Sequence, residues 1–300
     1  MTQNDNEYSA KAAGTDAAQA EGRDPRLVKA GELMNQGDID GARKLWREMA
    51  EAEDTRAEGL HGLGLADLAA GNLDGALERL EEAAALKPES AAFLNNLAAA
   101  QMRGKLLYPA KNTLSRALEL DRNYAEAWAN LGFVMLSLGD DFGEIDLILN
   151  RALSLRPGHL GALEHLAELR RRQNRHQERA IILKALAEAK TPRTALFLRQ
   201  AAESCLTFGD FAAAEPLLAQ AVSVDANNAD LARLHAEVLG ALGRTAAAKD
   251  ELRRGASLTS GQESWRWAHL GFAPRCFENA EGVDGYRQWL SDQLEEAAAE

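Results

Sequence analysis

The chain has 300 residues, of which 46% are hydrophobic and 27% are charged, so it holds enough apolar material for a buried core. Its formal net charge of −12 argues against sequence-independent binding to DNA, RNA or an anionic membrane surface. No stretch approaches the length of apolar sequence that a transmembrane helix needs, so no membrane partner is expected.

The N-terminal segment differs in composition from the rest. Residues 1–24 are polar and rich in Ala, Gly, Asp and Glu, and they lack the apolar central region of a signal peptide. We expect a disordered tail there. The two cysteines, Cys205 and Cys276, are far apart and form no CxxC pair, which predicts a reduced, cytoplasmic location without a disulfide framework.

From residue 25 onward a short segment recurs at a nearly constant interval. It is clearest in Gly37–Ala42, Gly71–Ala76 and Gly209–Ala214, each of which starts with Gly-Asp or Gly-Asn and ends with Ala. Its last position recurs every 34 or 35 residues, at Ala42, Ala76, Ala110, Ile145, Ala180, Ala214 and Ala248. Seven units in one frame predict a repeat protein.

Each unit has the signals of two antiparallel helices joined by a short turn. Glycines at 37, 71, 139, 209 and 243 are expected to end the first helices, and prolines at 88, 157 and 192 to follow the second helices. Pairs such as Leu94 and Leu97 place apolar side chains on one helix face. Since no unit can bury that face alone, neighbouring units are expected to share one core.

The period and the residue types resemble the tetratricopeptide repeat (TPR) over roughly residues 25–260. The best matches are Leu94-Asn95-Asn96-Leu97-Ala98 and Trp128-Ala129-Asn130-Leu131-Gly132. The resemblance implies an all-α fold, a right-handed TPR α-solenoid of about seven helix-turn-helix repeats. Trp46 and Trp128 occupy repeat core positions and are expected to serve packing.

The first helices of such a solenoid line its concave face, where a partner would bind. The two residues after the leading Leu or Trp of each first helix are expected to face this groove: His61, Gly62, Asn95, Asn96, Ala129, Asn130, Glu164, His165, Arg199, Gln200, Arg233 and Leu234. The candidate partner-binding residues are Asn95, Asn96, Asn130, His165, Arg199 and Gln200.

Amides suit an extended peptide because each one can donate to a backbone carbonyl and accept from a backbone N–H. An alternative is that Asn96 and Asn130 only solvate a helix surface or bond to the adjacent helix. The cluster Arg170-Arg171-Arg172 with Arg175 also has two interpretations. It is either a site for an acidic segment of a partner or a set of cations that complements a helix C-terminus.

Motifs for catalysis are missing from the sequence. The six histidines have no metal-ligand spacing, and neither a GxGxxG nor a P-loop motif is present. No GxSxG nucleophile elbow occurs either. We therefore expect a chain that is not an enzyme and that needs no cofactor and no metal.

After residue 260 the repeat frame fades and aromatic residues accumulate. Residues 261–300 are expected to form capping or junction helices, with a candidate docking surface at Trp265, Trp267, Phe272 and Trp289. The run from Trp265 to Pro274 is similar to the segment that follows the repeats in bacterial SPINDLY-like O-linked N-acetylglucosamine transferases, including those that modify flagellin. Asn96 and Asn130 resemble the asparagine ladder in the repeats of that family.

That resemblance implies a module that recruits a protein client, flagellin being a candidate, for a linked or partner glycosyltransferase catalytic domain. The catalytic domain of that family has no counterpart in these 300 residues. The other hypothesis is a freestanding cytosolic scaffold for protein-complex assembly. In both cases the expected partner is a protein or an extended peptide.

Overall fold

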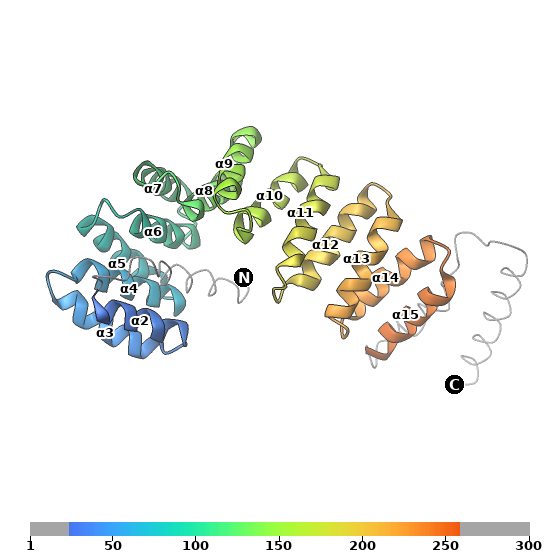
Figure 1. Cartoon of the computed structure of the whole chain (residues 1–300), viewed down its shortest axis with the longest axis horizontal. Coiled ribbons are helices and arrows are strands. Elements are labelled where there is room, and N and C mark those ends of the chain that lie inside the picture. The colour runs from blue at the N-terminus through green and yellow to red at the C-terminus, as the bar shows by residue number, and fades with distance from the viewer. Residues whose placement is uncertain (1–23, 259–300) are drawn as a thin grey trace, which may run out of the picture. The chain divides into compact units, whose positions relative to one another are not determined.

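A computed structural model describes residues 24–258, which form fourteen α-helices and no strand (Figure 1). The helices are α2 (Pro25–Asn35), α3 (Ile39–Glu51), α4 (Arg56–Ala69), α5 (Leu73–Leu86), α6 (Ala91–Arg103), α7 (Leu107–Leu120), α8 (Ala125–Leu138), α9 (Phe142–Leu155), α10 (Leu160–Arg172), α11 (His176–Glu188), α12 (Thr194–Thr207), α13 (Phe211–Val224), α14 (Ala229–Ala241) and α15 (Thr245–Leu258). They form seven pairs, each made of a first and a second helix, as the repeat frame predicts.

The described residues fall into two compact units that divide between His165 and Leu166, within α10. The first unit, residues 24–165, holds α2–α9 and the start of α10. The second unit, residues 166–258, holds the rest of α10 and α11–α15. The predicted tail and the predicted capping helices lie outside the described residues, so the domain boundaries at 24 and 260 stay predictions.

The turn inside each repeat contains one residue with a left-handed backbone. Gly37, Gly71, Gly139, Gly209 and Gly243 have φ between 76° and 82°, which confirms their predicted role. The other two repeats place Lys105 (φ 58°) and Asn174 (φ 56°) at this position. Asparagine tolerates the left-handed region, whereas the β-carbon of lysine makes it costly, so Lys105 is the unfavourable member of the series.

Several second helices begin with a side-chain cap directly after this turn. Asp38, Asn72 and Asp210 each accept a hydrogen bond from the backbone N–H three residues later, at 2.9, 3.3 and 2.9 Å. Such caps satisfy amide groups that have no partner inside the helix. In α7 the capping position is held by Leu106, which cannot accept such a bond. The third repeat therefore lacks both signals that start a second helix.

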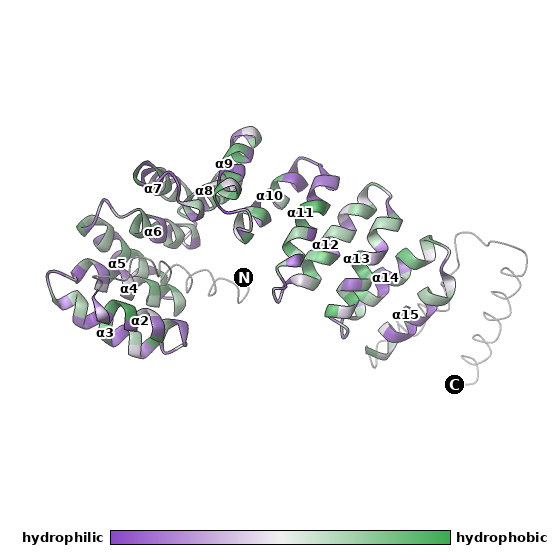
Figure 2. Ribbon diagram, viewed as in Figure 1, coloured by the Kyte–Doolittle hydropathy of each residue, from purple (hydrophilic) through white to green (hydrophobic). Residues whose placement is uncertain are grey.

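Small residues allow the helices of a pair to approach closely, as predicted. Ala42, Ala76 and Ala110 are fully buried, and so is Ile145, which holds the same position in the fourth repeat. Hydrophobic and hydrophilic residues are interspersed along the helices (Figure 2), and the buried hydrophobic residues form the core. Trp46, with 2% of its surface exposed, fills this core in α3, as expected.

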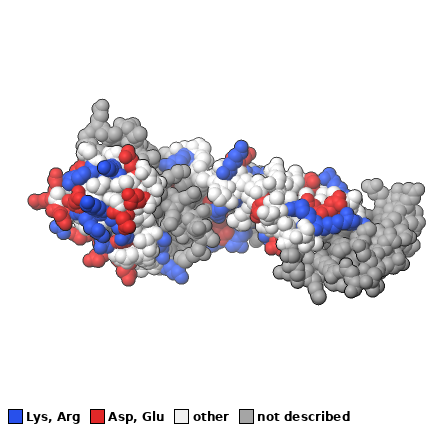
Figure 3. All heavy atoms as spheres, turned by 90° about the horizontal axis from the view of Figure 1, so that it is seen from below, with Lys and Arg blue, Asp and Glu red and all other residues white. Residues whose placement is uncertain are grey.

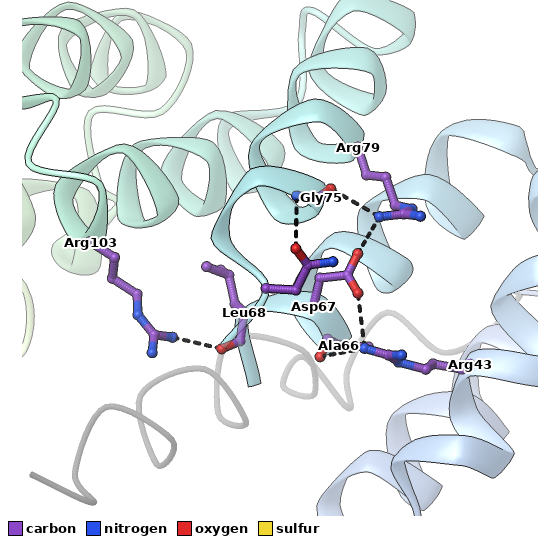
Figure 4. A network of polar contacts seen from close by, with 8 residues as sticks. Arg43, Ala66, Asp67, Leu68, Gly75, Arg79 and Arg103 are labelled. Atoms are coloured by element: carbon purple, nitrogen blue, oxygen red, sulfur yellow. Dashed lines mark hydrogen bonds and ion pairs between the residues drawn. The ribbon is translucent and has the colours of Figure 1, made fainter. Parts of the chain in front are cut away.

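Asp67 in α4 links helices of neighbouring repeats through a polar network (Figure 4). Its buried carboxylate accepts a hydrogen bond from Arg43 of α3 at 2.9 Å and also pairs with Arg79 of α5. Arg103 of α6 donates to the carbonyl of Leu68 at 3.0 Å, at the end of the same helix. The network fixes the C-terminal end of α4 against three other helices.

Candidate protein-binding site

Amide and imidazole groups on successive first helices of residues 24–165 are joined by hydrogen bonds. Asn130 of α8 donates from Nδ2 to Oδ1 of Asn95 in α6 at 2.9 Å. Asn96 of α6 contacts His61 Nε2 in α4 through its own Nδ2, also at 2.9 Å. Each bond joins residues 35 apart in the sequence, so one contact is repeated between consecutive repeats.

The contact with Asn96 determines which nitrogen of His61 carries the proton. An amide nitrogen can only donate, so the Nε2 atom of His61 must be the acceptor and the ring must be neutral. Burial disfavours the imidazolium form and lowers the pKa of His61 to about 4. Both observations describe an uncharged histidine at neutral pH.

Tyr124, the residue directly before α8, belongs to the same network. Burial and the nearby carboxylate of Glu126 raise the pKa of Tyr124 to about 12, and a hydrogen bond with Asn95 acts in the opposite direction. Asn95 is only 1% exposed, so its two polar atoms are used inside the protein, by Tyr124 and Asn130. Asn95 thus holds its neighbours in place and presents little surface to a partner.

Aromatic rings lie beside the amides on these helices. The rings of His61 and Phe93 are stacked, with centroids 4.2 Å apart and planes 8° from parallel. Phe133 in α8 contacts the ring of His165 in α10 at 5.1 Å between centroids. Burial, with a smaller effect of His159, lowers the pKa of His165 to about 4, so this second imidazole is also uncharged at neutral pH.

We define the first-helix strip as these amide, imidazole and phenyl groups of residues 24–165. Its members are His61, Phe93, Asn96, Asn130, Phe133 and His165. All but Asn96, which is 3% exposed, are half-buried. Within residues 24–258 no hydrogen bond engages the Oδ1 atom of Asn96 or of Asn130. The strip therefore combines apolar ring surface with amide groups whose hydrogen-bonding capacity is only partly used.

The residues that the sequence predicts for the groove do not share one environment in the structure. Asn95, Asn96 and Asn130 lie together and bond to adjacent first helices, which was the alternative left open for the last two. The expectation for Gly62 and Ala129 was wrong, because both are buried in the core. A β-carbon at Gly62 would lie 2.4 Å from the indole ring of Trp46 in α3, so any larger residue here would force that buried ring to shift.

Arg199 and Gln200 lie on α12 in the second unit and are half-buried. The guanidinium of Arg199 forms an ion pair with Glu203 at 2.8 Å, one turn later in the same helix. The backbone carbonyl of Gln200 accepts a hydrogen bond from the hydroxyl of Ser204 at 2.8 Å. Their proposed role in binding is thus independent of the amide network of the first unit.

The basic cluster at the end of α10 is paired with acidic side chains. Arg171 and Arg172 both contact Glu168, at 2.7 and 2.9 Å. Arg170 and Arg175 both contact Glu178 of α11, at 2.9 and 2.5 Å. Charges of both signs are likewise interspersed on the face at the N-terminal end seen in Figure 3. These contacts favour a structural role for the arginines over an acidic-peptide site.

Three further predictions concern metal binding, membrane spans and the C-terminal docking surface, and the structure bears on them only within residues 24–258. Within residues 24–258, no group of three or more His, Cys, Asp or Glu residues is arranged to hold a metal ion. In the same range, every helix is too short or too polar to cross a membrane. The aromatic residues proposed for docking, Trp265, Trp267, Phe272 and Trp289, lie outside the described residues.

Sequence reasoning missed Phe93, Phe133 and Tyr124. Phe133 lies three residues after Asn130, one helical turn along α8, and this spacing would have placed it beside the amide. Phe93 lies three residues before Asn96 in α6 in the same way. Tyr124 precedes its helix, and no helical periodicity indicates where a residue in a loop will point.

Comparison with known proteins identifies the repeat. Residues 67–132 match the family model described as tetratricopeptide repeat. A homologue of the BBSome complex member BBS4 from Drosophila melanogaster is 30% identical over 130 residues, which cover 43% of this chain and 26% of that protein. The chain therefore spans about a quarter of the length of this curated relative.

Solved structures agree on the fold. A tetratricopeptide repeat protein from Parabacteroides merdae ATCC 43184 is similar over 80% of this chain and 94% of its own, with a TM-score of 0.54 and 18% identity. A chain of the APC/C hetero-tetramer Cut9–Hcn1 is similar over 80% of this chain and 47% of its own, with a TM-score of 0.56 and 15% identity. Residues 67–132 thus match a tetratricopeptide repeat, and the described residues have the all-α fold of a TPR solenoid.

Proposed function

We propose that the chain binds an extended segment of a partner protein along the first-helix strip. The observation that supports this most directly is the composition of the strip. It offers neutral rings and partly unused amides on the first helices of four consecutive repeats, α4, α6, α8 and α10. Groups of this kind recognise a peptide backbone and apolar side chains without a strict sequence requirement.

Hydrogen bonds within the protein hold the side chains of the strip in place, which makes the strip suitable for binding. Asn95 bonds to Tyr124 and accepts a hydrogen bond from Asn130, and Asn96 and His61 hold one another. Side chains that are already ordered lose little conformational entropy when a partner binds. Arg199 and Gln200 of α12 are proposed as binding residues of the second unit by itself.

The narrower hypothesis is that this module recruits a client for glycosylation by a linked or partner glycosyltransferase, with flagellin as the candidate client. It is supported by the resemblance of residues 265–290 to the junction segment of SPINDLY-like transferases. The alternative is a freestanding cytosolic scaffold that assembles protein complexes. The fold is compatible with both because repeat solenoids serve many functions.

The binding face can be tested by affinity capture from bacterial cytosol followed by mass spectrometry. The bait is the full chain, as wild type or with Phe93→Ala and Phe133→Ala. A control bait carries Tyr108→Ala and Leu147→Ala, two large side chains that are 73% and 75% exposed on the second helices α7 and α9. We expect the strip variant to lose the captured proteins and the control to retain them. Loss in the control alone would place binding on the second helices.

The two narrower hypotheses differ in what is captured and in what happens to it. Recruitment for glycosylation predicts that a captured client gains N-acetylglucosamine when the chain is incubated with a SPINDLY-like catalytic domain and its sugar nucleotide. It also predicts that Trp265→Ala with Trp289→Ala abolishes this gain. A scaffold predicts a stable complex whose members carry no modification that depends on this chain.

A further inference from the structure

Two pairs of rings lie on the first helices of residues 24–165. The first pair joins α4 to α6, where His61 and Phe93 are stacked with centroids 4.2 Å apart. The second pair joins α8 to α10, where Phe133 and His165 are in contact with centroids 5.1 Å apart. All four residues are half-buried, so each pair keeps ring surface that a partner can contact.

A continuous series of contacts connects the two ring pairs. His61 bonds to Asn96 of α6. The adjacent Asn95 accepts a hydrogen bond from Asn130 of α8. Phe133 of the second pair follows Asn130 by three residues, which places these two side chains next to each other on the surface of α8. The two ring pairs therefore belong to one surface, with the amide of Asn130 between them.

The chemistry of this surface disfavours charged side chains of a partner. Burial lowers the pKa of His61 and of His165 to about 4, so both imidazoles are uncharged at neutral pH, and the other members of the strip are amides and phenyl rings. A charged side chain would lose its hydration there without gaining an ion pair from the strip. A large apolar side chain instead exchanges water for ring surface, which is favourable.

Between the ring pairs, Asn130 offers a hydrogen-bond acceptor. Its Nδ2 atom donates to Asn95, whereas no hydrogen bond within residues 24–258 engages its Oδ1 atom. The residue is half-buried, and its amide oxygen can accept a hydrogen bond from a backbone N–H of an extended segment. That bond holds the middle of the segment while the side chains on either side of it reach the rings.

The spacing of the helices determines how far apart two such apolar side chains must be. Packed helices have axes about 8–10 Å apart, and the ring pairs are separated by two such intervals in the series α4, α6, α8 and α10, or about 16–20 Å. An extended chain covers about 3.3 Å per residue, so this distance corresponds to about five or six residues.

We propose that the two ring pairs are paired subsites for large apolar side chains that stand about five or six residues apart in the bound polypeptide. One side chain lies on the rings of His61 and Phe93. The other lies on those of Phe133 and His165, and the backbone between them donates to Asn130. The inference rests on the proposed function and adds a ligand class, which is an extended segment with two spaced apolar anchors.

The test measures binding of three peptide pools to the full chain. All peptides have twelve residues, which are random mixtures of Gly, Ser, Thr, Asn and Gln except at fixed phenylalanines. The first pool has phenylalanine at positions 3 and 9, the second at positions 3 and 5, and the third at position 3 alone. We expect the first pool to bind about tenfold more tightly than the third because it buries a second apolar side chain. The second pool should bind like the third.

Phe133→Ala removes one subsite and should reduce the advantage of the first pool to less than about twofold. Phe142→Ala is the matched control, because it deletes the same ring from second helix α9, where this side chain is 38% exposed. The control should keep the full advantage. If circular dichroism shows that Phe133→Ala fails to fold, Phe93→Ala tests the same loss at the other ring pair.

Equal binding of the three pools to the wild-type chain overturns the paired subsites and leaves the proposed function standing. The same holds if the advantage of the first pool survives in Phe133→Ala or Phe93→Ala. Absence of binding by all three pools contradicts both the paired subsites and the proposed function.

Discussion

At the scale of single residues, the amides proposed for binding also join neighbouring first helices through hydrogen bonds. The sequence predicted that amides recur at one position of consecutive first helices, and Asn96 and Asn130 lie there. It left open which polar groups these amides contact. The contacts depend on which residue lies 35 positions away in the sequence. They also depend on Tyr124, a half-buried tyrosine outside the repeat pattern.

Replacing Asn130 by Ala should destabilise the protein. The change leaves Oδ1 of Asn95 buried without a donor, which typically costs about 1–3 kcal/mol of unfolding free energy. Asn150→Ala is the control, since Asn150 is exposed and bonds only to Asp146 in its own helix. Urea unfolding of the two variants should show a clear loss for the first and almost none for the second. Equal losses would mean that the bond to Asn95 contributes nothing.

The two neutral histidines predict a loss of stability in mild acid. The pKa of His61 and of His165 is about 4 in the folded chain, against an ordinary value of 6.5 for a solvated histidine. Unfolded chains therefore bind protons that the folded chain excludes, and stability falls as the pH decreases from 6.5 towards 4. At pH 5.5 we expect a loss of about 1 kcal/mol for each histidine relative to pH 7.

Glutamine at both histidines keeps an acceptor for Asn96 but does not titrate in this range. The double variant His61→Gln, His165→Gln should thus show a flatter dependence of urea stability on pH between 7 and 5.5. Carboxylates interfere little in this window. For example, hydrogen bonds from Arg171 hold the pKa of Glu168 at about 2 in the folded chain. An unchanged pH dependence in the double variant would contradict the assignment.

At the scale of helices, the repeat frame predicted the elements and their boundaries well. It did so because the same turn glycine, capping residue and small core residue recur in most repeats. The third repeat shows what the pattern could not reveal. Its glycine, Gly104, is displaced by one position, and Lys105 adopts the left-handed conformation in its place. This turn has the same left-handed geometry as the glycine turns although lysine does not favour it.

Lys105→Gly should therefore stabilise the chain. Glycine adopts φ near 58° without the steric cost of a β-carbon, so we expect a gain of about 1 kcal/mol in unfolding free energy. Lys105→Ala is the control, because it removes the same charge but retains the β-carbon. A higher melting temperature for the glycine variant alone is the predicted result. Equal effects of both variants would attribute the gain to charge and leave the backbone argument without support.

Asp67 tests how the repeats are joined. Asp67→Asn removes the charge that two arginines share in Figure 4, and we expect a cost of about 2–3 kcal/mol because both arginines keep some access to water. Asp250→Asn breaks a surface pair with Arg253, where the aspartate is 73% exposed, and should cost less than about 0.5 kcal/mol. Chemical denaturation of both variants measures the difference. Similar costs would show that burial of Asp67 is unimportant.

At the scale of the whole molecule, the fold class follows from period and composition, but the partner does not. Solenoid repeats conserve the residues that pack, and these define the frame from Ala42 to Ala248. Binding depends on the positions between them, which vary from one repeat to the next. Gly62 and Ala129 illustrate this, since both hold predicted groove positions and yet are buried in the core.

The measurement that tests the central claim most directly is photo-crosslinking to a captured partner. A photoreactive amino acid is placed at Ala99, half-buried on first helix α6 one turn beyond Asn96, or at Leu147, 75% exposed on second helix α9. Crosslinks from position 99 and none from position 147 are predicted if the partner occupies the first helices. Crosslinks from position 147 alone would contradict the account and would move the binding surface to the second helices.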